Sequence, residues 1–101
     1  MSVTDKSVSE KIILKLYITG ATHHSMRAVK NMKGICEEFL DNSYELDIID
    51  VYQQPNLAKE QQIIAAPTLI KIQPLPVRRI VGDMSDTEKI LTILSIKADD
   101  A

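Results

Sequence analysis

The sequence has little of several residue types on which particular functions depend. It contains one cysteine, three glycines and no tryptophan, and its formal net charge is −2. A single cysteine cannot form an internal disulfide, which fits a reducing compartment. Three glycines provide no phosphate-binding loop, and a charge so close to zero gives no general attraction to nucleic acid. The sequence therefore predicts no nucleotide cofactor and no nucleic-acid partner.

Long apolar runs are also absent. No stretch approaches the roughly 18 apolar residues that a membrane-spanning helix needs, and the first eleven residues do not resemble a signal peptide. A chain of 101 residues that is 45% hydrophobic and 26% charged supports one domain with a modest core. We expect a polar tail over 1–10, the domain over 11–97 and a short acidic tail over 98–101, in a cytoplasmic protein without membrane contact.

Hydrophobic patterning predicts a regular succession of strands and helices. Nearly continuous apolar runs are typical of strands buried on both faces, and apolar residues at three-to-four spacing are typical of helices. The expected elements are a strand over 12–18, a helix over 25–40, a strand over 44–51, a short helix from 55 to 61 or 62, strands over 68–72 and 77–81, and a helix after Ser85. A helix between the first two strands implies that they are parallel, whereas the short link at 73–76 makes the last two antiparallel.

This order predicts a thioredoxin-like α/β fold. Pro67 begins the third strand, a position that suits a residue without a backbone N–H and that permits a cis bond. We expect Thr22 or Ser25 to cap the first helix and a capping box starting at Ser85 to cap the last one. The buried stripe of the first helix is expected to comprise Met26, Val29, Met32, Cys36, Phe39 and Leu40.

A redox enzyme of this shape would carry Cys-x-x-Cys in the turn after the first strand, but the turn here reads Thr22-His23-His24-Ser25. Alcohols cannot perform thiol–disulfide exchange, and Cys36 lies three turns into the helix on its apolar stripe. A buried structural thiol of that kind is inert. The scaffold without its thiols favours a binding protein over an enzyme.

No other group of residues indicates catalysis or a metal site. Adjacent histidines such as His23 and His24 usually diverge instead of converging on one ion, and we interpret them as an exposed turn. The carboxylates are scattered, and each has a local role at a strand end, turn or cap: Asp50, Asp83, Asp86 and Glu88. We therefore expect no metal and no catalytic acid–base pair.

Three basic residues, Lys71, Arg78 and Arg79, fall on the predicted hairpin of the last two strands. We expect their side chains to project beyond the sheet face. One interpretation is an edge strand that charges and prolines protect from aggregation. The other is a basic docking surface for an acidic patch on a partner. Both follow from the same placement.

Several of these segments together resemble the KaiB family of bacterial clock proteins. The similarity covers residues 11–94, and its most specific block is Pro76-Val77-Arg78-Arg79-Ile80-x-Gly82-Asp83. The other matching segments are Leu14-Lys15-Leu16-Tyr17-Ile18-x-Gly20, Ser25-x-Arg27-Ala28, Ile49-Asp50-Val51 and Ala66-Pro67-Thr68-Leu69.

The resemblance implies a non-enzymatic regulator that binds the ATPase and kinase KaiC. It also implies competition with sensor-kinase domains of similar shape, and sequestration of KaiA. Family members exchange the thioredoxin-like form with a second fold, in which the C-terminal half is rewired and the protein forms a homotetramer. The positions that match the family and imply partner binding are Arg27, Lys71, Arg78 and Arg79; those that imply a structural role are Pro67, Gly82 and Asp83.

Some positions depart from the family pattern. Clock-forming relatives tend to carry lysine where this chain has Asp47 and Gln62, and a longer acidic tail than Asp99-Asp100. Ile93 and Ser95 stand where relatives often have glycine and aspartate, and loss of a helix-interior glycine favours the helix by up to about 1 kcal/mol. We therefore expect the thioredoxin-like form to be more populated in this protein than in clock-forming relatives.

Two further hypotheses stay open beside a clock regulator. A family member without the usual docking lysines fits a role in oxidative or salt stress without an oscillator, either on a divergent KaiC-like ATPase or as a homo-oligomer with an unrelated partner. An enzyme that depends on thiol or glutathione is the other alternative, against which the thiol-free turn argues.

Overall fold

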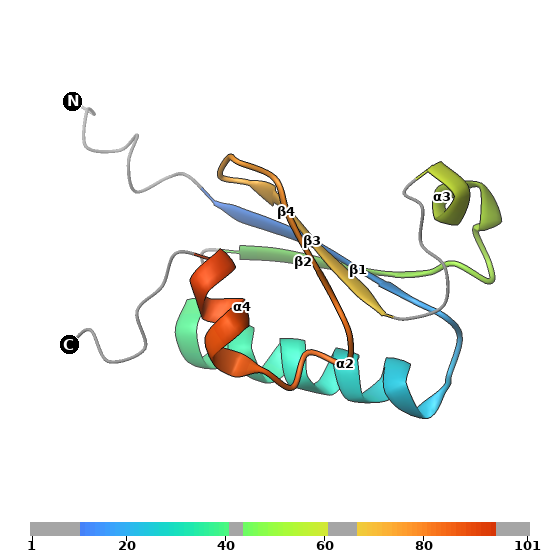
Figure 1. Cartoon of the computed structure of the whole chain (residues 1–101), viewed down its shortest axis with the longest axis horizontal. Coiled ribbons are helices and arrows are strands. Elements are labelled where there is room, and N and C mark those ends of the chain that lie inside the picture. The colour runs from blue at the N-terminus through green and yellow to red at the C-terminus, as the bar shows by residue number, and fades with distance from the viewer. Residues whose placement is uncertain (1–10, 41–43, 61–66, 95–101) are drawn as a thin grey trace.

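A computed structural model describes residues 11–40, 44–60 and 67–94 of the chain. Figure 1 shows an α/β arrangement in the order predicted from the sequence. Its elements are β1 (Ile12–Ile18), α2 (His23–Ile35), the π-helical segment η1 (Cys36–Leu40), β2 (Tyr44–Asp50), α3 (Pro55–Glu60), β3 (Thr68–Gln73), β4 (Arg78–Val81) and α4 (Thr87–Ile93). None of these helices is long and apolar enough to cross a membrane.

The four strands form one mixed sheet in the order β2-β1-β3-β4. β1 and β2 are parallel, with Leu14 opposite Leu46, and β3 runs antiparallel to both β1 and β4. Both predicted strand relationships are confirmed. β2 and β4 are therefore the edge strands, and the most apolar strands, β1 and β3, lie between them.

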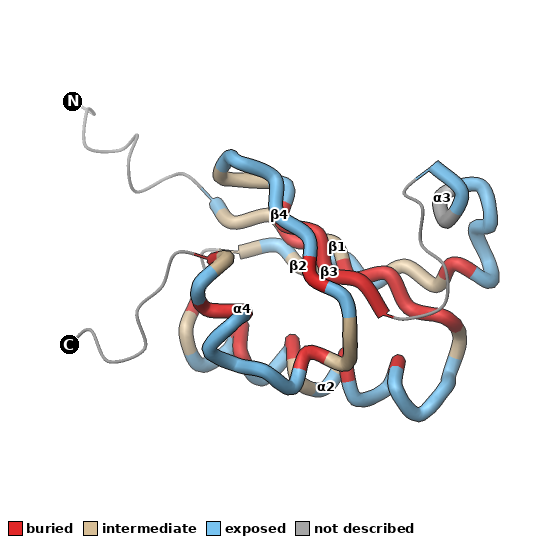
Figure 2. Tube along the Cα trace, in the orientation of Figure 1, coloured by how far each residue is buried: buried red, intermediate tan, exposed pale blue. Residues whose placement is uncertain are grey.

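The helices α2 and α4 lie on one side of the sheet, and α3 lies beyond one end of it toward the other side (Figure 1). Alternate residues of β1, such as Leu14 and Leu16, face α2 and α4 and belong to the main core. Tyr17 points to the opposite face, where it packs with Val51 and Ile70 in a smaller cluster. In Figure 2 the buried positions follow β1, β3 and the inner side of α2.

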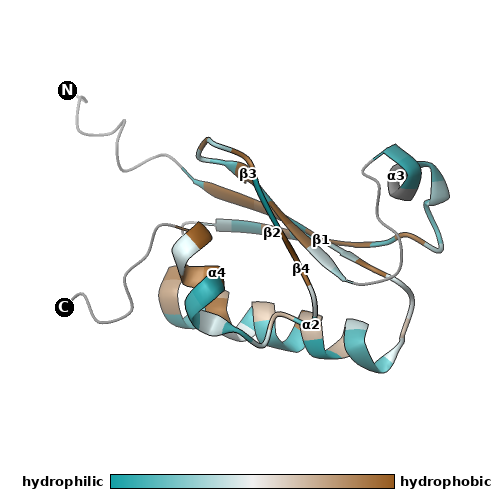
Figure 3. Cartoon of the chain, in the orientation of Figure 1, coloured by the Kyte–Doolittle hydropathy of each residue, from teal (hydrophilic) through white to brown (hydrophobic). Residues whose placement is uncertain are grey.

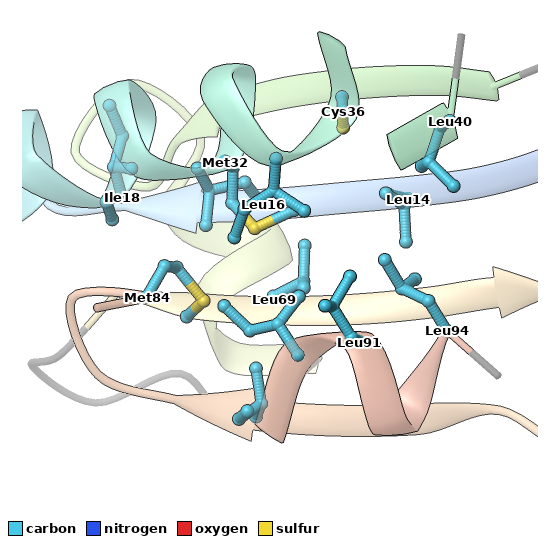
Figure 4. Close-up of a cluster of buried hydrophobic side chains, with 14 residues drawn as sticks. Leu14, Leu16, Ile18, Met32, Cys36, Leu40, Leu69, Met84, Leu91 and Leu94 are labelled. Atoms are coloured by element: carbon cyan, nitrogen blue, oxygen red, sulfur yellow. The ribbon is translucent and has the colours of Figure 1, made fainter. Parts of the chain in front are cut away.

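α2 begins at His23 and not at Ser25, and residues 36–40 of the predicted helix form the π-helical segment η1 after α2 ends at Ile35. Thr22 is its N-cap, because the hydroxyl of Thr22 accepts the backbone N–H of Ser25. Met32 and Cys36 point into the core (Figure 4). The prediction for Met26 is wrong: its side chain is 45% exposed, and the buried stripe at this end of α2 runs through Ser25 and Ala28 instead.

The predicted capping box of α4 is also wrong. The N-cap is Asp86, whose carboxylate accepts the backbone N–H of Lys89. Ser85 is one residue too early, and its own N–H donates to Oδ1 of Asp83 at 3.1 Å. Both residues are good caps, and the preceding turn around Asp83 decides between them. The buried side of α4 consists of Ile90 and Leu91, followed by Leu94.

Some sequence predictions concern residues outside the described ranges. They are the two tails over 1–10 and 98–101, the end of the short helix beyond Glu60, the bond before Pro67, and the positions of Gln62 and Ser95. The positions predicted to be exposed are exposed: Lys30 and Lys33 on α2, and Glu37 and Glu38 on η1. Figure 3 shows hydrophilic residues along the outer side of α2.

Candidate partner-binding surface

The turn between β1 and α2 is held by hydroxyl groups. Oγ of Ser25 accepts the backbone N–H of Thr19 at 3.0 Å and lies 3.2 Å from Oγ1 of Thr19. Ser25 is fully buried, and Thr22 caps the helix from the other side of the turn. The hydroxyl groups of Ser25 and Thr22 accept backbone N–H groups of the turn. This is the position where a thioredoxin-like enzyme carries its thiols. The turn has a structural role.

Cys36 is buried between α2 and β1 (Figure 4). Burial, with a smaller contribution from the charge of Glu37, raises the pKa of its thiol to about 11. The reactive thiolate is therefore scarce at neutral pH. The geometry agrees with the interpretation of Cys36 as core packing.

Pro67, Gly82 and Asp83 form a junction at the end of the sheet. The backbone N–H of Gly82 donates to the carbonyl oxygen of Pro67 at 2.9 Å, which closes the start of β3 against the end of β4. Gly82 has a φ of 133°, a conformation that residues with a side chain rarely adopt. Asp83 follows directly and turns the chain toward α4.

Asp83 connects this junction to α2. Nε of Arg27 lies 3.5 Å from Oδ2 of Asp83, and the side-chain amide of Asn31 donates to the carbonyl oxygen of Asp83 at 2.9 Å. Hydrogen bonding by the Ser85 hydroxyl lowers the pKa of Asp83 most, with smaller contributions from the Ser85 N–H and the charges of Arg27 and His24; burial opposes them. Asp83 therefore holds the loop after β4 against α2.

The basic residues of the hairpin do not all project as predicted. Arg78 and Arg79 are exposed, but Lys71 is only 2% exposed. Lys71 shares its face of the sheet with the core residue Leu69, and Arg78 lies directly opposite it on β4. The long aliphatic part of a lysine side chain can cover apolar surface in this way. Arg79 pairs with Ile70 and therefore lies on the other face.

The four predicted partner-binding residues thus form a band along β4 and not one cluster. Arg78 stands at the start of β4, whereas Arg27 reaches the loop that follows its end through Asp83. Arg78 and Arg79 point to opposite faces of an edge strand. A partner that contacts both must therefore wrap around the β4 edge.

Exposed apolar side chains lie beside these charges. Val77 and Val81 flank the two arginines along the chain, and Leu75 stands at the hairpin connection; all three are exposed. Aromatic, aliphatic and arginine side chains next to each other are typical of protein interfaces. We call Leu75, Val77, Arg78, Arg79 and Val81 the β4 edge surface.

The opposite edge of the sheet has a different charge. Glu45 and Asp47 are exposed on β2, and Glu45 pairs with Lys11 at 3.7 Å. Asp47 lies opposite Lys15 in the strand register. Asp47 is therefore an exposed acid on an edge strand.

Sequence reasoning missed Asn31, which holds the loop at Asp83 together with Arg27. The available signal was spacing, because residues four apart lie on the same face of a helix. His23 and His24 are exposed, as predicted. The described residues contain no group of three or more His, Cys, Asp or Glu side chains that could hold a metal.

One small pocket lies between β4 and the start of α4. Its volume is about 130 Å³, well below the roughly 300 Å³ at which small-molecule sites begin. It is open and lined partly by polar side chains, among them Asp83, Ser85 and Lys89. It does not suggest a substrate or cofactor site.

Comparison with known proteins finds a matching family and similar sequences. The family model described as "KaiB domain" matches residues 15–96. The circadian clock oscillator protein KaiB of Synechococcus elongatus is 52% identical over 84 residues, which cover 83% of this chain and 82% of that protein.

Similar solved structures show the fold. The N-terminal domain of Synechococcus elongatus SasA superposes with a TM-score of 0.69 at 22% identity, over 91% of this chain and 90% of that domain. Chloroplastic thioredoxin z also gives a TM-score of 0.69, at 17% identity, over 94% of this chain and 91% of that one. The predicted thioredoxin-like fold is confirmed.

Proposed function

Because this chain belongs to the KaiB family, we propose that it is a clock-related regulator that binds a KaiC-like ATPase through the β4 edge surface and performs no catalysis itself. The observation that carries this proposal is the exposed pair Arg78 and Arg79 with its apolar neighbours. An edge strand with basic and apolar side chains suits a partner surface of acidic and apolar groups. Arg27 contributes from the other end of β4.

The proposal is tested by size-exclusion chromatography and titration with the KaiC-like ATPase of the same organism, with and without ATP. The double variant Arg78→Glu/Arg79→Glu should weaken binding by at least about tenfold, because reversed charges repel the partner. The matched control is Lys30→Glu/Lys33→Glu, which reverses two exposed charges on α2. The absence of a complex in every nucleotide state would remove this proposal, and so would equal weakening by both double variants.

An enzymatic role finds no support in the site. Support for a non-catalytic regulator comes from the hydroxyl-filled turn at Thr22 and Ser25 and from the inert, buried Cys36. A disulfide-reduction assay with and without glutathione checks this directly. Turnover that depends on Cys36 would contradict the proposal.

The further partners that the family resemblance implies are part of the same proposal. They are KaiA or a sensor histidine kinase, and additional copies of this chain in a dimer or tetramer. The SasA domain has the same fold, which fits competition between two thioredoxin-like domains for one ATPase surface. Light scattering across concentrations, with circular dichroism to follow the fold, measures the assembly.

Asp47 favours a second candidate function, regulation in a stress response without an oscillator. This exposed acid replaces a lysine that clock-forming relatives tend to carry for docking, while the β4 edge surface is retained. A strain without the gene should then survive oxidative or salt challenge poorly, with no change in any daily rhythm. Normal survival together with the loss of a daily rhythm would support the clock function instead of the stress function.

A further inference from the structure

Met84 combines an unusual backbone conformation with a buried side chain and a place beside a pocket. It is 4% exposed and belongs to the main core cluster, together with Leu69 and Leu91 (Figure 4). Its φ is 63°, in the left-handed region that a residue with a long side chain rarely adopts. It also lines the pocket between β4 and α4. The side chain therefore lies between the core and an open pocket.

The packing of the Met84 side chain holds the loop that connects β4 to α4. A left-handed conformation is unfavourable for a residue with a Cβ atom, so it persists only where the surrounding contacts impose it. On one side of Met84, Arg27 and Asn31 of α2 fix Asp83. On the other side, α4 begins at Thr87. Loss of the Met84 side chain from the core therefore releases this loop and the start of α4.

The four sulfur atoms of the described residues differ in their access to small oxidants. Met26 is exposed on α2, whereas Met32 and Cys36 are fully buried and do not line the pocket. Burial raises the pKa of Cys36 to about 11, so the thiolate that reacts with peroxide is scarce at neutral pH. A thioether needs no deprotonation, and the pocket has room for several water-sized molecules. Met84 is therefore the buried sulfur that a small oxidant reaches.

We propose that Met84 is a site of reversible oxidation by hydrogen peroxide, and that its sulfoxide releases α4 from the core. A lone pair of the sulfur attacks one peroxide oxygen, and the S–O bond forms as the O–O bond breaks. The proton of the attacked oxygen passes to the other oxygen, which leaves as water. The sulfur loses two electrons and the peroxide gains them. A methionine sulfoxide reductase, with a thiol as the reductant, reverses the change.

Oxidation changes the environment that the Met84 side chain favours. A sulfoxide is polar, and its burial in the apolar core without a hydrogen-bond donor is unfavourable. The pocket is lined partly by polar side chains, among them Ser85 and Lys89. The oxidised side chain therefore moves out of the core into the pocket, and the core beneath α4 loses part of its packing. Val81 of the β4 edge surface lines the same pocket, so the change reaches the proposed partner-binding surface.

The first test treats the full chain with hydrogen peroxide and follows sulfoxide formation at each methionine by peptide mass spectrometry. Met26 should be oxidised first, and Met84 at least about fivefold faster than Met32. In urea these differences should disappear, because the fold then protects no side chain. Equal rates at Met84 and Met32 in the native protein would show that the pocket does not admit the oxidant, and would overturn the proposal.

The second test measures hydrogen exchange before and after oxidation in the variant Met26→Leu, which lacks the exposed thioether of α2. The N–H groups of Ile90 and Leu94 donate within α4 and its N-cap. They should exchange at least about fivefold faster after oxidation, as expected when a buried polar group lacks a partner. The N–H of Leu16 in the central strand β1 should change less. Treatment with methionine sulfoxide reductases and a thiol should restore the original rates.

The matched control is the double variant Met26→Leu/Met84→Leu, which keeps an apolar side chain at position 84 and removes its thioether. Peroxide should leave its hydrogen exchange unchanged. The same response in both variants contradicts the assignment to Met84, and so does an equal increase at Leu16 and in α4. The first test does not depend on either variant. An effect of oxidation on partner binding rests on the proposed function, whereas the oxidation and the release of α4 are measured on this protein alone.

Discussion

Tyr52 lies against Gly20 so closely that a Cβ atom on Gly20 would stand 2.9 Å from Cδ2 of the tyrosine ring. Both residues also donate their backbone N–H groups to Oδ1 of Asp50, at 3.0 Å from Gly20 and 2.9 Å from Tyr52. The turns that follow β1 and β2 are thus joined by one carboxylate and one ring contact. This junction fixes the end of the sheet near the β1–α2 turn.

Gly20→Ala should destabilise the protein by about 1–2 kcal/mol, the cost of a left-handed backbone conformation for a residue with a side chain. The φ of Gly20 is 73°, and the exposed Tyr52 ring must also move. The matched control is Gly34→Ala, where nothing lies within 4 Å of the added carbon. Because Gly34 lies inside α2, alanine there should stabilise by up to about 1 kcal/mol. Urea unfolding of both variants measures the difference, and equal effects would contradict this account.

Two methionines of α2 should respond very differently to truncation. Met32 is fully buried among core residues, whereas Met26 is largely exposed. Met32→Ala should cost about 2–5 kcal/mol through lost burial and a cavity, and Met26→Ala should stay within about 0.5 kcal/mol. Chemical denaturation of the two variants side by side is the measurement. A comparable loss in both would mean that Met26 is covered in solution.

The contrast between these methionines shows how far the sequence determines the fold. Element order, strand directions and most core positions follow from apolar periodicity, which Met32 and Cys36 obey. Met26 lies to one side of the buried stripe, which at that end of α2 runs through Ser25 and Ala28. Ser25 is polar, and its burial depends on the contact of its hydroxyl with Thr19, which apolar spacing does not reveal.

The cap of α4 gives a direct test of a corrected prediction. Asp86→Ala should destabilise the protein by about 1 kcal/mol, because the N–H of Lys89 loses its acceptor. Ser85→Ala keeps that acceptor and should cost less. Thermal unfolding of the two variants measures this, and circular dichroism checks the helix content. A larger loss of helix content in Ser85→Ala than in Asp86→Ala would support the capping box predicted from the sequence.

Cys36 should react with thiol reagents far more slowly than a free cysteine. Its pKa of about 11 and its position in the core both suppress the thiolate at neutral pH. We expect labelling by a chromogenic disulfide reagent to be at least about 100-fold slower in the native protein than in urea. Rapid labelling of the native protein would reveal an accessible thiol and reopen a redox function.

The candidate site was less predictable than the fold. The sequence identified Arg27, Lys71, Arg78 and Arg79 as basic residues but treated those of the hairpin as equally exposed. Alternation along β3 and β4 places Lys71 with the core and Arg79 on the opposite face. Which residue of each strand faces the core depends on the register between β3 and β4. The sequence leaves this register open, because it does not fix the length of the turn that joins the two strands.

Asp83 should make the folded protein sensitive to acid. Hydrogen bonds from Ser85 and the charge of Arg27 lower the pKa of Asp83 below its ordinary value of 3.8. A carboxylate whose pKa is lowered by folding stabilises the protein fully above the unfolded-state pKa, and this stability is lost as the pH falls through the folded-state pKa. Asp83→Asn should therefore be less stable than the wild type at pH 7 and approach it as the pH falls through the folded-state pKa, which lies below 3.8. Urea unfolding from pH 7 to pH 2 measures both curves, with Glu38→Gln as a control that removes an exposed charge. Parallel curves for Asp83→Asn and the wild type would show that the pKa of Asp83 does not change on folding, and that its link to Arg27 contributes no charge-dependent stability.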